Sequence, residues 1–227
     1  MNSDNFNLPN DLIERVSHLN STLLCDGLIN SGAMDYTIKP VTAEQKVIGP
    51  AFTVSLEPGD NLFLHEAIHT APEGSVLVVD GKGYKHRAYL GELMAFAAKA
   101  KNVKGIIIDG LVRDYDVLST MEFPIFAKGF IPAGPFKEGP GSIDQRISCG
   151  GIVVNSGDLI VGDTDGVVVI PRDELENTIS NAEKKLAYET NRVEEILKYS
   201  KLKSEGAPVN SIEPSWLRVK MKKFEGC

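Results

Sequence analysis

Cysteine is scarce in this chain of 227 residues, and the three that occur are far apart. Cys25, Cys149 and Cys227 include no CxxC pair, so the sequence contains no disulfide framework. Disulfide-rich folds occur in oxidising compartments, whereas a small, odd number of cysteines is typical of proteins in a reducing compartment. We therefore expect a cytoplasmic protein.

Long hydrophobic runs and an excess of basic residues are also missing. No apolar stretch approaches the ~20 residues that cross a bilayer, and the polar segment 1–9 lacks the basic start and apolar core of a signal peptide. The 24 Lys and Arg residues against 31 Asp and Glu residues give a formal net charge of −7. These features argue against a membrane or a nucleic acid as the partner.

The composition that remains is that of an ordinary globular protein, and its centre is a repeated unit. Residues 75–80 and 106–109 are apolar, β-branched runs, each ending in Asp followed by Gly. Between them, residues 88–101 are alanine-rich and favour a helix. This β-loop-α-β order predicts two parallel neighbouring strands with a right-handed crossover.

The other elements surround this unit. Helices are expected over residues 11–20, 23–32, 61–69, 113–120 and 172–198, and strands over residues 47–56, 123–127, 147–155 and 159–170. Residues 158–166 are typical of a hairpin, and Asp158, Asp163 and Asp165 are interpreted as its turn residues rather than as a metal cluster. The tail from Gly206 contains proline and is expected to be loosely ordered or packed on a neighbour. We predict one α/β domain over residues 1–227.

Arg113 and Asp114 are the first candidates for chemistry, because they follow the strand that ends in Asp109-Gly110. Ligands in α/β folds bind beyond the carboxyl ends of the strands. An Arg can hold a carboxylate through two parallel hydrogen bonds, and an Asp can hold a hard divalent cation. A surface ion pair, or an Asp that stabilises a helix N-terminus, is the structural alternative.

A second element strengthens the functional interpretation. Gly91 is a natural place for the crossover helix to begin, which would leave the amides of Glu92, Leu93 and Met94 unpaired. Free amides at a helix N-terminus form an anion site, and a glycine lets an anion approach the backbone. The alternative is that Gly91 only lets helix and sheet pack closely.

These residues carry a resemblance. The pattern YLGELMA at residues 89–95, followed by DGLVRD at residues 109–114, resembles the RraA-like family, and within it the class II pyruvate aldolases that act on 4-hydroxy-4-methyl-2-oxoglutarate and 4-carboxy-4-hydroxy-2-oxoadipate. The resemblance covers about residues 10–175. Further matching stretches are Ser21-Thr22 with Asp26, Gly59-Asp60-Asn61, Val78-Val79-Asp80, Phe123-Pro124-Ile125-Phe126, Cys149-Gly150-Gly151, and residues 157–161 and 165–171.

The resemblance implies a fold and an assembly. The fold is a swivelling β/β/α sandwich of the kind also seen in phosphohistidine domains, here with helical N- and C-terminal segments, so that the C-terminal helix and tail cover residues 172–227. The assembly is a homotrimer or homohexamer with sites between subunits. An acidic residue from a neighbour's C-terminal helix reaches the site, and Glu189 is the candidate.

The resemblance also implies roles for the site residues. Arg113 binds the carboxylate of a 2-oxo acid together with the backbone at Gly91, Leu93 and Met94. Asp114 binds Mg²⁺ or Mn²⁺, and Glu92 is the acidic residue near the waters of that metal.

Two further residues are tentative candidates from their position alone. His86 follows the Gly83 loop and could face the site, although an exposed loop histidine is the simpler interpretation. Arg87 beside it could contact the distal carboxylate of a dicarboxylic substrate. Lys82 and Lys128 have no recognisable activating context for a Schiff base, which needs burial or a cationic neighbour.

The predicted function is a divalent-metal-dependent lyase that cleaves 4-hydroxy-2-oxo acids to pyruvate and also decarboxylates oxaloacetate. Both reactions leave an enolate, whose growing negative charge a divalent cation stabilises. Two alternatives stay open. The chain could be a non-catalytic regulator that binds an RNA-degrading enzyme, although RraA proteins typically lack the Asp after the Arg, or a related lyase or hydratase acting on another 2-oxo acid.

Overall fold

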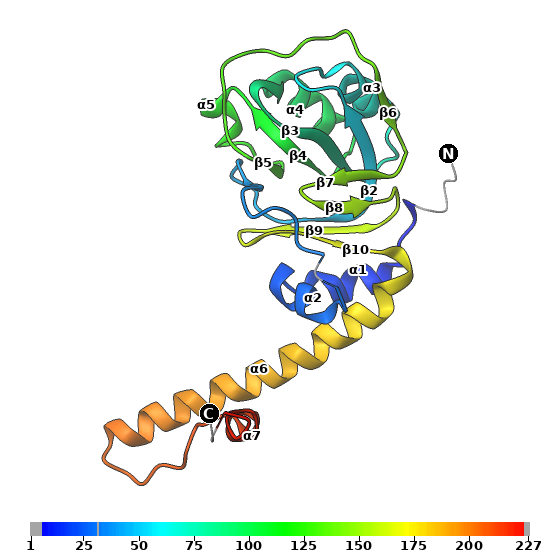
Figure 1. The fold of residues 1–227 in the computed structure, drawn as a ribbon. Helices are drawn as coiled ribbons and strands as arrows, with labels where there is room; N and C mark the ends of the chain where they lie inside the picture. The colour runs from blue at the N-terminus through cyan, green and yellow to red at the C-terminus, as the bar shows by residue number, and fades with distance from the viewer. Residues whose placement is uncertain (1–5, 31, 225–227) are drawn as a thin grey trace. The chain divides into compact units, whose positions relative to one another are not determined.

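The computed structural model describes residues 6–30 and 32–224, which form a mixed α/β fold (Figure 1). The chain divides into two compact units, one up to Glu183 and one from Lys184 onward. The first unit contains every strand and most of the helices. Its α/β class agrees with the sequence prediction.

An eight-stranded sheet forms the centre of the first unit, in the order β1-β5-β4-β3-β2-β9-β10, with β6 paired to β2. The central neighbours β2, β3, β4 and β5 are parallel, whereas β1, β6, β9 and β10 pair antiparallel. The predicted parallel pairing of the two apolar strands is therefore confirmed. The strands are β1 (Lys39–Pro40), β2 (Val47–Leu56), β3 (Val76–Leu90), β4 (Gly105–Val112), β5 (Ile125–Ala127), β6 (Gly141–Ile143), β9 (Leu159–Asp163) and β10 (Gly166–Ile170).

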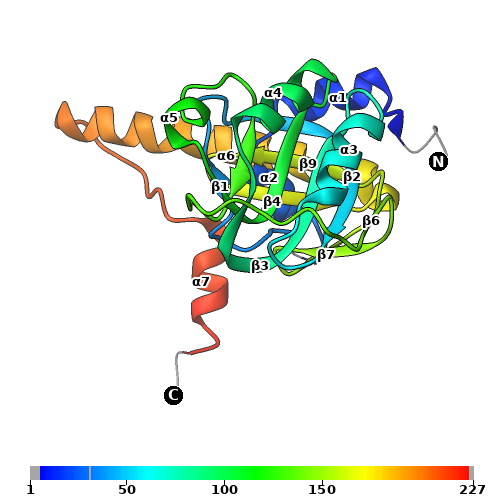
Figure 2. The ribbon, with the colours of Figure 1, turned by 90° about the horizontal axis from the view of Figure 1, so that it is seen from above.

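Helices cover the sheet on one face (Figures 1 and 2). Leu77 and Val79 of β3 point into a core shared with α3 (Leu62–Thr70) and α4 (Glu92–Ala100). Val76 and Val78 alternate to the opposite face, whose core includes the small hairpin of β7 (Ile147–Cys149) and β8 (Ile152–Val154). Because side chains of a strand alternate between faces, the uninterrupted apolar run of β3 indicates a strand buried on both sides.

The N-terminal helices pack near the β9–β10 hairpin (Figure 1). They are α1 (Asn10–Ser17) and α2 (Ser21–Gly27). Helix α2 ends earlier than the predicted 32, because the backbone turns extended at Leu28. Just before this end Gly27 packs so closely on Thr178 that a Cβ would lie 2.5 Å from its carbonyl oxygen. The helix therefore stops where its backbone meets the start of α6 (Leu175–Ser204), which a 3-10 helix at Arg172–Glu174 precedes.

Strand β3 differs most from its prediction. A strand was expected only to Asp80, with a loop at residues 81–83, but the strand runs on irregularly to Leu90. Its pairing with β4 shifts register three times after Val79, and Lys82 and Gly83 both have positive φ. These bulges let the chain stay paired while it bends, so helix α4 starts only at Glu92.

The second unit contains the rest of α6 and a further helix, α7 (Ser215–Met221). The tail from Gly206, expected to be loosely ordered or packed on a neighbour, thus contains a regular helix, and its packing on a neighbour stays a prediction. The signal was weak, because α7 is short and buries none of its side chains within the chain. In the described part of the chain, no helix is both long and apolar enough to cross a membrane.

Candidate functional site

The candidate site forms where β3 and β4 end side by side. Leu90 and Val112 are register partners at the ends of these parallel strands, and the Arg113 N–H donates to the Leu90 carbonyl at 3.0 Å. The residues that follow each strand, Gly91 and Arg113, are therefore brought together. The sequence predicts the carboxyl edge of these strands, but with the second strand ending at Asp109, whereas β4 runs on to Val112.

Asp114 is held in an unusual backbone conformation. Its φ of 65° and ψ of 48° place it in the left-handed region, which Asp tolerates better than most residues. It directly precedes the short helix α5 (Tyr115–Leu118). Its Oδ2 accepts a hydrogen bond from the Glu92 N–H at 3.0 Å and lies 3.6 Å from Arg113 Nε.

This contact corrects one part of the predicted anion site. The Glu92 amide is not free, because the carboxylate of Asp114 already occupies the N-terminus of α4. The amides of Leu93 and Met94 form no hydrogen bond that we find among the described residues, and they remain available. Two of the three predicted amide donors are thus open to a ligand.

Gly91 is required for steric reasons rather than for its backbone angles, which are ordinary extended ones. A Cβ at this position would lie 2.2 Å from Asp114 Oδ2 and 3.0 Å from Arg113 Nε. No real Cβ approaches other atoms so closely. Gly91 therefore permits close packing, as the structural alternative expects. The atoms that pack against it belong to the two candidate site residues, Asp114 and Arg113.

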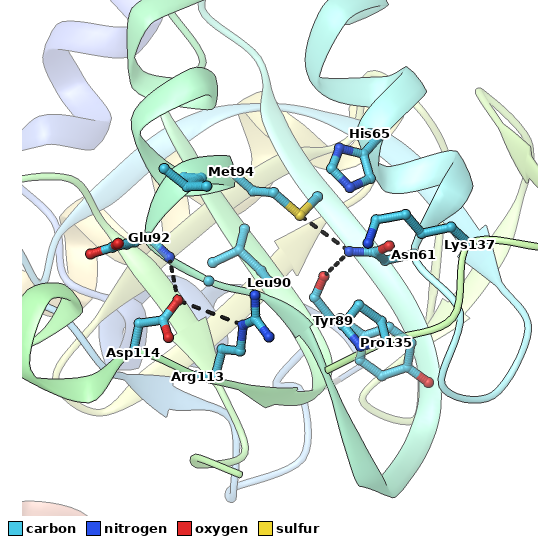
Figure 3. A pocket seen from close by; sticks show the side chains of 12 residues that line it. Asn61, His65, Tyr89, Leu90, Glu92, Met94, Arg113, Asp114, Pro135 and Lys137 are labelled. Atoms are coloured by element: carbon cyan, nitrogen blue, oxygen red, sulfur yellow. Dashed lines mark hydrogen bonds and ion pairs between the residues drawn. The ribbon is translucent and has the colours of Figure 1, made fainter. Parts of the chain in front are cut away.

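A cavity of about 340 Å³ opens over these residues (Figure 3). It brings together all the principal predicted residues: Gly91, Glu92, Leu93, Met94, Arg113 and Asp114. The Glu92 carboxylate points away from the Arg113 guanidinium, on the side where Asp114 lies (Figure 3). The other lining residues are Asn61, His65, Tyr89, Leu90, Pro135 and Lys137.

Three of these polar residues were not predicted as site residues: Asn61, His65 and Lys137. They come from the start of α3 and from the loop before β6, which the sequence places far from Arg113. Asn61 lies in the Gly59-Asp60-Asn61 stretch that carries the family resemblance, and this was the available signal. Asn61 is the N-cap residue of α3, but its side chain makes no capping hydrogen bond.

Asp60 ties the Lys137 loop to α3. Its Oδ1 accepts from the Leu62 N–H at 2.9 Å, and its Oδ2 accepts from the N–H groups of Glu138 and Gly139. Burial opposes ionisation of Asp60, but these backbone donors outweigh it and lower the pKa of its carboxyl. The charged carboxylate thus holds the loop that carries Lys137 beside the cavity.

The cavity is lined by two positively charged side chains, Arg113 and Lys137, and by two carboxylates, Glu92 and Asp114. Arg113 is half-buried, and Lys137 is exposed. Burial lowers the pKa of His65, and the positive charges of Lys137 and His69 lower it further, which favours the neutral imidazole. Burial raises the pKa of Tyr89 to about 12, and its hydroxyl donates to the Gly81 carbonyl. Arg113 and Lys137 thus offer positive charge to an anionic ligand, while Glu92 and Asp114 offer negative charge to a cation.

The tentative residues lie elsewhere. His86 is exposed and its ring contacts Tyr84. Arg87 donates to the Gly134 carbonyl, and its guanidinium stacks 3.8 Å above the centre of the Phe136 ring. Neither lines the cavity. Glu189 belongs to the second unit, where its carboxylate is 3.6 Å from Lys185 Nζ, and its role toward a second subunit stays a prediction.

A divalent cation fits the donor set at Asp114. Asp114 Oδ1 has no partner that we find among the described residues, and its side chain is 35% exposed. The described residues contain no group of three or more His, Cys, Asp or Glu side chains arranged to enclose a metal. Mg²⁺ suits such a site, because it is commonly held by one or two carboxylates and keeps several waters.

The other polar clusters have structural roles. Asp163 accepts from the amide and hydroxyl of Ser21 at 2.7 Å each, and Asp158 accepts from the amides of Asn155 and Arg172. Cys149 is buried, and burial raises the pKa of its thiol far above the ordinary value. Lys128 pairs with Asp109 and Asp35 and is therefore not free to act as a nucleophile.

Comparison with known proteins gives the chain's relatives. A protein of Halalkalibacterium halodurans, provisionally named 4-hydroxy-4-methyl-2-oxoglutarate aldolase, is 40% identical over 177 residues, which are 78% of this chain and 84% of that protein. The structure of an uncharacterized protein from Pseudomonas syringae has a TM-score of 0.75 and 26% identity, over 84% of this chain and 90% of that one.

A second solved structure is titled as an RNA-processing inhibitor, RraA from Thermus thermophilis. It has a TM-score of 0.62 and 28% identity, over 67% of this chain and 92% of that one. The family model described as RraA-like, Aldolase/RraA, matches residues 21–169, which include every residue around the cavity. The chain therefore belongs to the RraA-like family.

Proposed function

We propose that this protein is a metal-dependent lyase that cleaves 4-hydroxy-2-oxo dicarboxylic acids to pyruvate and a second oxo acid, and that it also decarboxylates oxaloacetate. One observation carries the proposal. A single cavity holds a guanidinium, a carboxylate oxygen without a partner, and two unpaired backbone amides. These groups match the two ends of a 2-oxo acid bound beside a hard cation.

Each group has a specific task in this proposal. Arg113 binds the C1 carboxylate of the ligand and the amides of Leu93 and Met94 support it, because charge-assisted bonds to a carboxylate are strong. Asp114 holds Mg²⁺ or Mn²⁺ through its free oxygen. When bound, the cation supplies positive charge that stabilises the enolate oxygen, an effect worth several kcal/mol. Lys137 supplies a second positive charge for a distal carboxylate.

The reaction breaks the C3–C4 bond of the substrate. The C4 hydroxyl loses its proton, the C4–O bond becomes a carbonyl, and the bonding electrons move to C3 and C2 to form the enolate. Arg113 stabilises the negative charge that develops there. A proton added at C3 then gives pyruvate, and with oxaloacetate the same bond breaks with release of CO₂. Glu92 is the carboxylate that we assign to proton transfer.

The test is pyruvate release from 4-hydroxy-4-methyl-2-oxoglutarate and from oxaloacetate, with Mg²⁺ or Mn²⁺ and again after chelation. We expect release that depends on the metal and falls by at least about 100-fold in Asp114→Asn. This variant keeps an oxygen that accepts from the Glu92 amide, so the helix cap is preserved while the charge is lost. Lys101→Gln, at an exposed position after α4, is the control.

A second candidate function is a binding protein without catalysis, and the similarity to the Thermus RraA structure favours it. Absence of pyruvate release from both substrates, with either metal, would contradict the lyase proposal and favour this alternative or a lyase for a different 2-oxo acid. Asp114 is the residue that favours catalysis, because one of its carboxylate oxygens is open to a divalent cation beside Arg113.

A further inference from the structure

The cavity wall contains a buried hydrogen-bond acceptor without a donor. Asn61 is 2% exposed, and among the described residues its Oδ1 accepts no hydrogen bond. Buried polar atoms are almost always paired, and a buried orphan acceptor is costly. An orphan that lines a candidate active site therefore points to a ligand that supplies the missing donor.

The orientation of the Asn61 amide follows from its other contacts. Its Nδ2 donates to the Tyr89 carbonyl at 2.8 Å and to Met94 Sδ at 3.2 Å. A flipped amide would set two oxygens against each other at Tyr89, because a carbonyl can only accept. The nitrogen is thus fixed on the Met94 side, and the oxygen faces away from it, on the side where Lys137 lies (Figure 3).

The unpaired Oδ1 of Asn61 limits which ligand groups can bind next to it. Asn61 Oδ1 can accept a hydrogen bond but cannot donate one, and both amide hydrogens are already engaged. A ligand carboxylate or carbonyl oxygen in this place would be repelled, whereas a ligand hydroxyl would satisfy it. The site therefore distinguishes ligands by the presence of a hydroxyl on the part that lies away from Arg113.

We propose that Asn61 is a specificity-determining residue that accepts a hydrogen bond from the C4 hydroxyl of the substrate. This inference rests on the proposed function, which places the 2-oxo acid end of the ligand against Arg113. It adds that hydroxylated substrates are preferred over those that lack the hydroxyl, such as oxaloacetate. Lys137 is the competing donor within the cavity, and the experiment has to separate the two.

The test uses two ligands that differ only in this hydroxyl and that cannot be cleaved. 2,4-Dihydroxyglutarate and 2-hydroxyglutarate both lack the C2 carbonyl that would accept the electrons of the C3–C4 bond. Calorimetric titration of the Mg²⁺-loaded protein therefore measures binding alone. We expect the dihydroxy ligand to bind about tenfold more tightly to the wild type, and this ratio to fall to about one in Asn61→Ala.

Two matched variants separate the explanations. Met94→Leu removes the sulfur contact of Nδ2 but leaves Oδ1 in place, and Lys137→Met removes the competing donor. Both are expected to keep the preference for the hydroxylated ligand, even where overall affinity changes. A preference lost in Lys137→Met but kept in Asn61→Ala would assign the effect to the lysine and overturn the proposal.

Measurements on the wild type alone can also contradict the proposal, which is wrong if the two ligands bind equally or if neither binds. The test therefore does not depend on how well a variant folds. It is separable from the proposed function because turnover is not measured. A clear hydroxyl preference without pyruvate release would support Asn61 as a hydroxyl acceptor and contradict the lyase. Pyruvate release without any preference for the hydroxylated ligand would support the lyase and contradict the role of Asn61.

Discussion

At the scale of single residues, Gly91 is a position of the site where no side chain fits. We predict that Gly91→Ala lowers kcat/KM by about 100-fold, because the new Cβ displaces the Asp114 carboxylate and the Arg113 side chain, and a misplacement of about 1 Å has effects of that size. Steady-state kinetics with oxaloacetate measure the loss. The matched control is Gly151→Ala, where a Cβ meets nothing within 4 Å.

The control should lose stability but not activity. Gly151 has a φ of 81°, so an alanine there is strained by about 1 kcal/mol, while the site is untouched. If Gly91→Ala kept wild-type kinetics, the contact between Gly91 and Asp114 would not matter for catalysis, and the proposed place of Asp114 in the site would be wrong.

His65 makes stability depend on pH. Its pKa is lowered from 6.5 in the folded protein, first by burial and then by Lys137 and His69, so the unfolded chain binds the proton more readily. The stability that the neutral imidazole provides is therefore present above pH 6.5 and is lost as the pH falls through and below that value. We predict that Tm falls less steeply between about pH 7 and pH 5 in His65→Gln.

His18 provides the matched control for this prediction. It is exposed at the end of α1, and His18→Gln should follow the wild-type curve. An equally steep fall of Tm in His65→Gln would show that other groups, such as the buried carboxyls, govern this pH range.

The residues at the site show what the sequence could and could not predict. Gly91, Arg113 and Asp114 were found because each follows a recognisable strand or helix signal, and parallel strands bring such positions to one edge. Asn61, His65 and Lys137 were missed because they reach the cavity from α3 and the loop before β6. Which loop closes over a strand edge depends on tertiary contacts such as those of Asp60, and local pattern does not encode them.

At the scale of elements, an ion network joins the ends of β4 and β5 to the segment before β1. Lys128 Nζ lies 2.7 Å from Asp109 Oδ1 and 3.1 Å from Asp35 Oδ2. Burial lowers the pKa of Lys128, but its hydrogen bonds with the two carboxylates outweigh this and raise it. Asp109 also accepts from the Gly150 N–H, which fixes the β7–β8 turn.

We predict that Lys128→Met destabilises the protein by about 2 kcal/mol, because it leaves the buried Asp109 charge without its partner while the more exposed Asp35 is partly compensated by solvent. Urea unfolding at pH 7 measures the change. Lys85→Met, at an exposed position on β3, should stay within about 0.5 kcal/mol of the wild type. Asp109→Asn combined with Lys128→Met should recover part of the loss, and additive losses would contradict a coupled network.

The elements themselves were predicted well where one face or both faces are buried. Strand β2 begins at Val47 and ends at Leu56 as predicted, because an apolar run stops before Pro58-Gly59, although Gly49-Pro50 lie within the strand. The extension of β3 beyond Asp80 was not predictable, since residues 81–87 are polar and glycine-rich and are paired only through bulges. Helix α7 has no buried face within the chain, so no apolar periodicity revealed it.

At the scale of the whole molecule, the second unit displays more apolar surface than a chain on its own requires. Leu197 is 63% exposed and Trp216 is 48% exposed. Further exposed apolar residues of this unit are Tyr188, Val193, Ile196, Val209, Val219, Met221 and Phe224. Apolar side chains exposed in such number commonly mark a contact with another protein, and tryptophan is enriched among the residues that stabilise such contacts.

We predict that the chain is a homotrimer or homohexamer and that truncation after Ala207, which removes Trp216 with α7, lowers the mass of the assembly. Multi-angle light scattering after size-exclusion chromatography measures that mass. Trp216→Ser should weaken the assembly in the same direction, because a buried tryptophan contributes much of the binding energy of an interface. Lys222→Ser, at an exposed position directly after α7, is the control and should leave the mass unchanged. An unchanged mass after truncation would show that the contacts that hold the assembly lie outside α7 and the segment that precedes it, and would contradict this prediction.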